Sequence, residues 1–243
     1  MAEASILTPV TDRSLFSMHP EDWVTQHDSH DEQGGYFKDA LRLVLPDCFV
    51  ARDLAVYWVP GQLQHPYAGP DIFVSRRQPR VEDPRAWLVY EDGPLELVIE
   101  VASEGTRSRE GDRRDKTYAL ELKVPEHLFV DLYEDKLELS ILIDGRYEPV
   151  APDEHGILWS PRLGVGFIRL PGERLVRVLT AAGEVVPTRR EAEARQREAE
   201  AGQREAEARA EALAAELERL RAAMEGADHK DSDADGGPGA SGP

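Results

Sequence analysis

The sequence predicts an α/β (α+β) domain with a mixed central sheet flanked by helices, followed by a long charged helix. Apolar runs of strand length alternate with segments of helical periodicity through the first three quarters of the chain. Their order, helix, strand, strand, helix, strand, strand, does not suit a doubly wound sheet. A seven-residue repeat then fills the chain beyond Thr188. We therefore expect an irregular N-terminal segment (1–34), a folded domain (35–187), a heptad-repeat helix (188–226) and a disordered tail (227–243).

Local patterns justify the elements in order. Apolar residues at helical spacing predict a first helix over 36–45, which Pro46 ends. The remaining apolar runs predict extended segments at 49–59, 71–75 and 95–103, a loop leading into a helix at 105–122, two strands within 126–143 joined by a tight turn at 134–136, and short strands at 147–150 and 164–170 that complete the sheet. We expect three tryptophans to pack in or near the core: Trp58, Trp87 and Trp159.

Composition excludes several classes of protein. The chain has 243 residues with 41% hydrophobic content, and no apolar run approaches the roughly 18 residues of a membrane span. The N-terminus carries no basic region followed by an apolar one, so we expect no secretory signal. Cys48 is the only cysteine, which excludes an intrachain disulfide and a cysteine zinc site. Together these features favour a cytoplasmic protein with no membrane partner.

The formal net charge is −18. Residues 188–243 hold 9 basic and 14 acidic side chains, which gives −5, and residues 1–187 hold 20 and 33, which gives −13. The folded domain is therefore acidic in its own right. Because affinity for phosphates comes from Lys and Arg, this argues against tight, non-specific coating of DNA, although it does not forbid a local site.

The C-terminal helix contains an internal repeat. The segments REAEARQ, REAEAGQ and REAEARA begin at Arg190, Arg197 and Arg204. A short seam at 4-3-4 spacing follows: Leu213, Leu217, Leu220 and Met224. Two interpretations stay open, a solvated single helix held by Glu–Arg pairs and self-association through the leucine end.

A buried acid marks the strand at 95–103. Alternation places Glu100 on one face with Val98, opposite Leu97 and Ile99, and a carboxylate among apolar neighbours is costly unless it is paired, hydrogen-bonded or bound to a metal. If the strand after Asp71 pairs with this one, the two carboxylates converge at one end of the sheet. Such oxygen-rich sites suit Mg²⁺ or Mn²⁺.

The following helix could add a positive charge beside that cation. Lys116 could orient or help to deprotonate a water, or stabilise charge on a phosphate. Glu96, nearer the start of the strand, is expected to face solvent.

The motifs resemble those of the bacterial putative restriction endonuclease family within the PD-(D/E)XK nuclease superfamily. The resemblance covers about 57–170 and rests on ordered motifs: Pro70 and Asp71; Glu100, Val101 and Ser103; Asp112 and Lys116; Glu126 and Asp131; and a Ser-x-x-Leu-Gly-Val segment at 160–165. Many members also carry an Ala/Glu/Arg-rich terminal helix. The resemblance implies a restriction-endonuclease-like core and a metal-dependent endonuclease that hydrolyses DNA phosphodiester bonds.

Site residues follow from the resemblance. It implies that Asp71 and Glu100 bind Mg²⁺ or Mn²⁺ with the backbone carbonyl of Val101, that Asp71, Glu100 and Lys116 are catalytic, and that Asp112, Ser103 and Arg113 are accessory.

Three departures from the family pattern affect these assignments. Ala102 stands where the superfamily's plain motif has its lysine, and Lys123 stands where the family has a glycine. Tyr118 follows Lys116 more closely than usual. We therefore expect the helix between these residues to have a different local geometry.

Each residue also has a simpler interpretation. An Asp after a Pro is common in turns, and Asp112 with Lys116 makes a routine helical ion pair. The basic cluster Arg107, Arg109, Arg113 and Arg114 fits either a solvated helix face or a path for a phosphate backbone. His27, His30 and His65 lack ligand spacing and receive no role. The alternative function is a catalytically silent binding or assembly module that forms a homodimer, or binds a partner protein, through the 188–226 helix.

Overall fold

The computed structural model describes residues 28–60, 67–102 and 113–232. The chain divides into two compact units, Met1–Thr188 and Arg189–Pro243. The helices are α1 (Asp28–Val44), α2 (Val89–Asp92), the π-helix η3 (Arg113–Glu121) and α4 (Arg189–Ser232). The strands are β1 (Phe49–Arg52), β2 (Val56–Tyr57), β3 (Tyr67–Ala68), β4 (Ile72–Ser75), β5 (Trp87–Leu88), β6 (Leu97–Val101), β7 (Glu126–Asp131), β8 (Lys136–Ile143), β9 (Arg146–Pro149), β10 (Leu158–Trp159), β11 (Gly166–Arg169) and β12 (Val176–Leu179).

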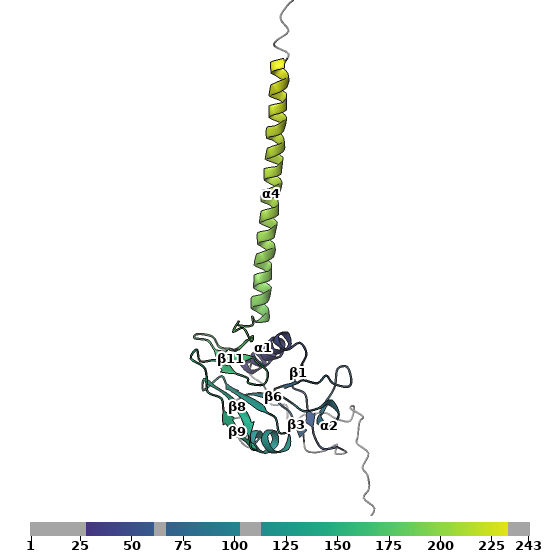
Figure 1. Ribbon diagram of the computed structural model, residues 1–243, viewed down its shortest axis with the longest axis vertical. Coiled ribbons are helices and arrows are strands. Elements are labelled where there is room, and N and C mark those ends of the chain that lie inside the picture. Colours follow the sequence, from purple (N-terminus) through teal and green to yellow (C-terminus); the bar gives the residue numbers. More distant parts are fainter. Residues whose placement is uncertain (1–27, 61–66, 103–112, 233–243) are drawn as a thin grey trace, which may run out of the picture. The chain divides into compact units, whose positions relative to one another are not determined.

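A six-stranded sheet with the order β1-β4-β6-β7-β8-β9 forms the centre of the first unit (Figure 1). Strands β6 and β7 pair in parallel and the other neighbours pair antiparallel, so the sheet is mixed and not doubly wound, as predicted. The prediction that the segment at 164–170 completes this sheet is wrong. That segment supplies β11 to a separate three-stranded sheet, β10-β11-β12, and a second small sheet has the order β3-β2-β5.

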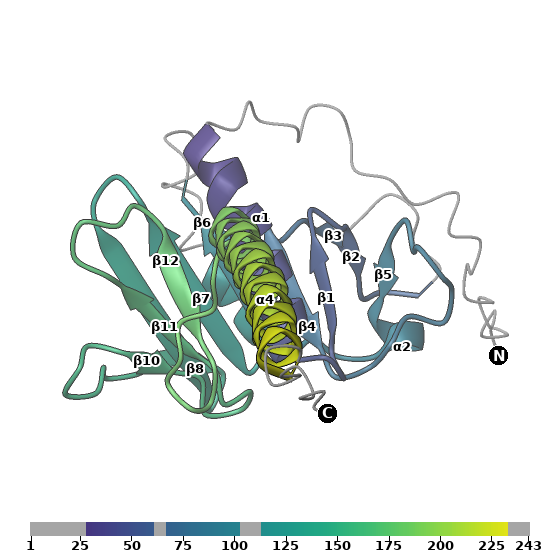
Figure 2. The ribbon, with the colours of Figure 1, turned by 90° about the horizontal axis from the view of Figure 1, so that it is seen from above.

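The central sheet separates two hydrophobic cores. One core joins Leu97, Ile99 and Val101 of β6 to α1 and the β10–β12 sheet. The other joins Val98 to η3 and to β2, β3 and β5, and it contains the fully buried Trp87. Figure 2 shows the two small sheets at opposite sides of the large one. Because successive side chains of β6 enter opposite cores, any charged residue on this strand must be compensated locally.

Helix α1 begins at Asp28, earlier than predicted, so 28–34 is helical rather than irregular. The side-chain amide of Gln33 donates to the carbonyl of Val176 (3.0 Å) and accepts from its N–H (2.8 Å), which fixes this turn of the helix to β12.

Gly34, the next residue of α1, lies close to Arg52 of β1. A Cβ on Gly34 would lie 3.0 Å from Nε of Arg52. The glycine that resembles a loop residue in the sequence therefore lets an arginine from β1 approach the helix, and tertiary contacts override its low helical propensity.

The helix after β6 is a π-helix, in which Leu122 N–H donates to the Thr117 carbonyl five residues earlier (2.9 Å). It ends at Glu121, and Lys123 follows with a φ of 51°, in the left-handed region. The family pattern has a glycine at this position, and glycine adopts this conformation at little cost. Lys123 thus keeps a backbone conformation that suits glycine.

Replacing Lys123 with glycine should stabilise the protein. Lys123 is exposed, so the change removes the steric cost of a left-handed non-glycine residue without opening a cavity. The gain should be about 0.5–1 kcal/mol after the larger entropy of glycine in the unfolded chain is subtracted. Urea unfolding monitored by circular dichroism would measure it. The control Asp39→Gly, at an exposed helical position of α1, should lower stability, and a similar loss for Lys123→Gly would contradict the prediction.

Among the residues described, no helix combines the length and the apolar character needed to cross a membrane.

Candidate functional site

Asp71 and Glu100 lie at the same end of the central sheet. Ile72 of β4 pairs with Ile99 of β6 in antiparallel register, so Asp71 and Glu100 occupy the next pair of positions. The N–H of Val101 donates to Oδ2 of Asp71 at 2.7 Å, which fixes the carboxylate beside β6. The two strands therefore pair as the sequence analysis required, and they bring the two acids together.

Glu100 is almost fully buried, with 2% of its surface exposed. It shares its side of the strand with Val98, and the hydroxyl of Tyr118, from η3, donates to its Oε1. Tyr118 itself is fully buried. Sequence reasoning noted the close spacing of Tyr118 to Lys116 but did not predict this contact, because the register of a π-helix is not visible in the sequence.

Lys116 lies on the same helix as Tyr118, and its side chain is exposed. Ser103 and Asp112 lie outside the described residues, and Arg113 begins η3 but its side chain lies outside them as well. Within the basic cluster, the described Arg114 pairs with Glu138 of β8 at 3.2 Å and with its neighbour Asp115 at 3.1 Å. Of the residues that the resemblance assigns to η3, Lys116 is therefore the one whose side chain the structure places.

His30, from the first turn of α1, contacts the site although the sequence assigned it no role. Its Nε2 lies 3.2 Å from Oδ2 of Asp71, and only 6% of its side chain is exposed. Burial lowers the pKa of His30, but the hydrogen bond to Asp71 and the charge of Asp71 outweigh it, so the pKa is raised above 6.5. The Nδ1 atom is buried and has no hydrogen-bond partner in the described parts of the chain. His30 and Asp71 are far apart in the sequence, and no sequence pattern indicated that they would be in contact.

A third carboxylate lies one strand further along. Arg52 of β1 pairs with Ile72, so Asp53 occupies the position opposite Asp71, and its N–H donates to the Asp71 carbonyl at 3.0 Å. Burial and the charge of Asp71 raise the pKa of Asp53, whereas Arg52, at 3.1 Å, opposes this rise. Asp53, Asp71 and Glu100 therefore occupy adjacent register positions across β1, β4 and β6.

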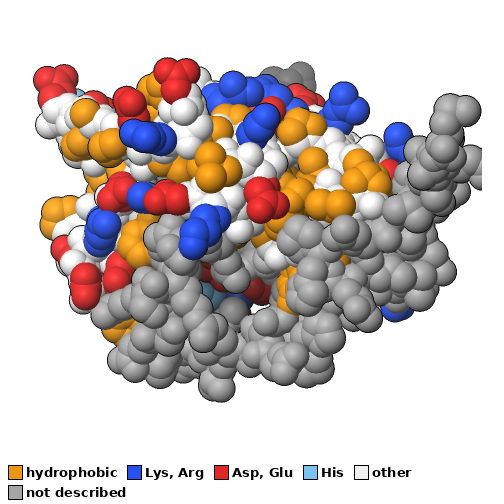
Figure 3. Space-filling model, turned by 90° about the horizontal axis from the view of Figure 1, so that it is seen from below, with side chains coloured by type: hydrophobic (Ala, Val, Ile, Leu, Met, Phe, Trp, Pro, Cys, Tyr) orange, Lys and Arg blue, Asp and Glu red, His pale blue; other side chains and the backbone are white. Residues whose placement is uncertain are grey.

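The donor atoms at this end of the sheet are oxygens. The N–H of Val101 points toward Asp71, so in an extended strand its carbonyl lies on the same side of β6. Two carboxylates and a backbone carbonyl form a hard-ligand set, which suits Mg²⁺ or Mn²⁺ completed by water. Within the described ranges, no three His, Cys, Asp or Glu side chains are arranged to hold a metal ion by themselves. Seen from below, the described surface carries both acidic and basic side chains (Figure 3).

The opposite end of β6 has a different set of charges. Glu126, at the start of β7, is fully buried, and its carboxylate accepts from the Ser160 hydroxyl (2.5 Å) and from the Arg162 N–H (2.9 Å). Burial raises the pKa of Glu126, while these hydrogen bonds lower it. The Arg162 side chain continues to Glu96 at 2.6 Å. Glu96 is buried with an arginine partner, so the expectation that it faces solvent is wrong.

The other motif acids therefore have structural contacts. Ser160 also accepts from the Leu163 N–H (2.9 Å), so the Ser-x-x-Leu-Gly segment folds around Glu126 and holds the loop before β11. Asp131 ends β7 and accepts from the N–H groups of Tyr133 (2.8 Å) and Glu134 (3.0 Å), which closes the turn into β8.

Known proteins similar to this chain include a protein family and a solved structure. The search of curated proteins gave no match. A solved structure titled as a "putative nuclease belonging to DUF820" from Anabaena variabilis is similar, with a TM-score of 0.45 and 15% identity over 58% of this chain and 76% of that one. The model of the Uma2 family, described as "Putative restriction endonuclease", matches residues 14–172, which is more than half of the chain. The chain therefore belongs to the Uma2 family.

Proposed function

We propose that this chain is a metal-dependent endonuclease that hydrolyses DNA phosphodiester bonds at the end of β4 and β6. The observation that supports this most is the convergence of Asp71 and Glu100, which hydrogen bonding to Val101 fixes at one end of the sheet. Glu100 is almost fully buried, so a cation bound beside it would offset part of the cost of burying its charge. Membership of the Uma2 family gives this arrangement its enzymatic context.

The donor set fits Mg²⁺ or Mn²⁺, held by Asp71, Glu100 and the carbonyl of Val101. When bound there, such a cation supplies Lewis acidity, which lowers the pKa of a water and neutralises charge on a phosphate. Tyr118 donates to Oε1 of Glu100 and so keeps that carboxylate oriented.

Lys116 is proposed to position the attacking water or to stabilise charge on the phosphate, and its exposed side chain is accessible to a substrate. Asp112, Ser103 and Arg113 keep their proposed accessory roles. Arg114 already forms ion pairs with Glu138 and Asp115, so a phosphate contact would have to compete with them.

Removing either carboxylate should abolish cleavage. Asp71→Asn and Glu100→Gln keep the size of the side chain but lose the charge that binds the cation. Nicking of supercoiled plasmid in Mg²⁺ or Mn²⁺ should fall at least about 100-fold, since loss of outer-sphere partners alone costs up to that much. EDTA should abolish nicking by the unmodified protein.

The matched control is Glu148→Gln, which removes an exposed carboxylate from β9. It should cleave as the unmodified protein does. Equal cleavage by all four proteins would contradict the assignment of the site. Absence of both cleavage and Mn²⁺ binding in the unmodified protein would favour the alternative function, a silent nuclease fold used for binding or assembly.

Whether the chain is a nuclease or a silent assembly module, helix α4 carries a surface suited to self-association. Its first half is held by pairs within the helix, such as Arg189–Glu193 and Gln203–Glu207, both at 2.9 Å. Its second half exposes Leu213, Leu217 and Leu220 to between 55% and 61%. Exposed leucines at heptad spacing are typical of a coiled-coil seam.

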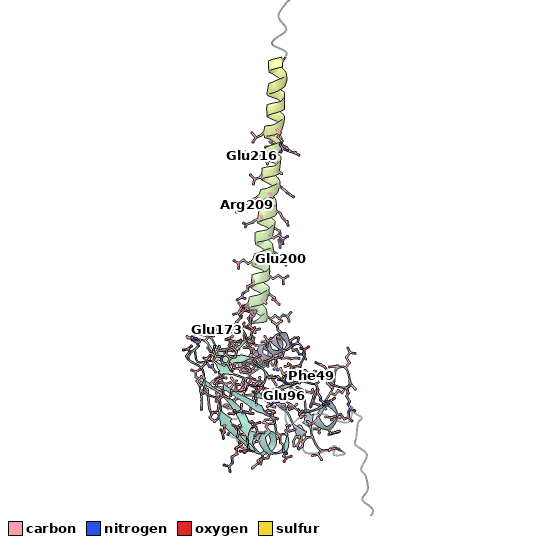
Figure 4. All side chains as sticks on the ribbon, viewed as in Figure 1. Phe49, Glu96, Glu173, Glu200, Arg209 and Glu216 are labelled. Carbon is pink, nitrogen blue, oxygen red and sulfur yellow. The ribbon has the colours of Figure 1, made fainter. Side chains whose placement is uncertain are left out.

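The flanking charges suit a parallel pair of these helices. With Leu217 at position a, a parallel dimer places Arg195 of one copy opposite Glu200 of the other, and Glu216 opposite Arg221. Figure 4 shows Glu200, Arg209 and Glu216 projecting away from the helix, where a second copy could reach them. We therefore propose a homodimer formed through the leucine end of α4.

A charge in the seam should dissociate this dimer. Leu217→Glu buries a carboxylate between the two helices, whereas Ala215→Glu adds the same group on the outer face of α4. Light scattering after size exclusion should report a dimer for the unmodified protein and for Ala215→Glu, and a monomer for Leu217→Glu. A monomeric unmodified protein, or a dimer that tolerates Leu217→Glu, would contradict the proposal.

A further inference from the structure

The geometry points to His30 as a positioning residue that orients the Asp71 carboxylate for cation binding. The inference rests on the proposed function, because it assumes that Asp71 is a ligand. The Nε2 atom of His30 lies 3.2 Å from Oδ2 of Asp71, although α1 and β4 are far apart in the sequence.

Two donors converge on one oxygen of Asp71. The Val101 N–H donates to Oδ2 at 2.7 Å, and His30 Nε2 reaches the same atom. Neither donor involves Oδ1, and the described part of the chain places no hydrogen-bond donor on it. Two donors on one oxygen restrict the orientation of the carboxylate, which would lower the cost of holding a cation with the second oxygen.

The position of His30 is itself rigid. It lies one helical turn before Gln33, whose side chain makes two hydrogen bonds to Val176. Its imidazole is buried, and its Nε2 faces a carboxylate, so Nε2 carries a proton and donates it toward Asp71. The buried Nδ1 lacks a partner among the residues described, so Asp71 is the polar contact that accounts for a histidine at this place.

A simpler interpretation is that His30 and Asp71 only fasten α1 to the sheet. That role predicts a loss of folding stability on removal of the imidazole and no effect on metal binding by the folded protein. A positioning role predicts a loss of metal affinity, which a side chain with an N–H donor at the same distance should restore. His30→Gln retains an amide N–H near the Nε2 position, whereas His30→Ala removes the donor.

The experiment is a Mn²⁺ titration of the full chain without DNA, with free Mn²⁺ measured by electron paramagnetic resonance. His30→Ala should weaken Mn²⁺ binding about 10-fold, the lower end of the cost of losing a group that orients a metal ligand. His30→Gln should retain most of the affinity. Arg42→Ala is the control, because it removes the hydrogen bonds from the far end of α1 to the Val50 carbonyl and should leave Mn²⁺ affinity unchanged. Urea unfolding of each variant reports the change in stability separately.

The outcomes separate this inference from the proposed function. Binding that is lost in Asp71→Asn but unchanged in a folded His30→Ala would overturn the role of His30 and leave the site intact. Equal weakening by His30→Ala, His30→Gln and Arg42→Ala would reduce His30 to a structural contact. Absence of binding in the unmodified protein, or binding unaffected by Asp71→Asn, would overturn the proposed metal site and the role of His30 with it.

Discussion

Burial of carboxylates at both ends of β6 is the constraint on which the rest of the domain depends. Glu96 and Glu100 are 8% and 2% exposed, and an uncompensated charge at either place would cost several kcal/mol. At the first end, Arg162 reaches Glu96 from 66 residues away in the sequence. At the second end, Tyr118 donates to Glu100 from the π-helix. The loop before β11 and the helix after β6 are therefore tied to the same central strand by polar contacts as well as by the two apolar cores.

The two ends of β6 differ in how the negative charge of their buried carboxylates is compensated. Glu126 accepts from Ser160 and from the Arg162 N–H, so its carboxylate is occupied by the loop that it holds. The charge of Arg162 lies on Glu96 at the same end, which makes this end an ion-paired, structural one. At the other end, the Val101 N–H and His30 contact Asp71, and the Tyr118 hydroxyl donates to Glu100. The motif acids Glu126 and Asp131 thus have structural contacts, and Asp71 and Glu100 are the ones to which the proposed function assigns a cation.

Sequence reasoning correctly predicted the features that depend on the local pattern of apolar and polar residues. Alternation in β6 and the Pro-Asp start of β4 were enough to predict that Asp71 would lie near Glu100 if the two strands paired, and they do pair. It missed His30, Tyr118 and the burial of Glu96, whose environments depend on contacts between distant segments. It also treated Gly34 as a loop residue, although the close approach of Arg52 explains that glycine inside α1. The sheet of β10–β12 was missed for a related reason: short strands do not indicate which sheet they join.

The row of carboxylates also bears on how an acidic domain could act on DNA. Asp53, Asp71 and Glu100 occupy adjacent register positions, and the chain as a whole carries a formal charge of −18. A phosphate backbone is repelled by such a surface unless positive charge is supplied at the point of contact. Arg114 is already paired with Glu138 and Asp115, and Arg52 with Asp31 and Asp53, so these arginines offer little net charge to a substrate. If the proposed function holds, a cation held by Asp71 and Glu100 would offset much of this negative charge, and with Lys116 it would contribute to binding DNA as well as to its hydrolysis.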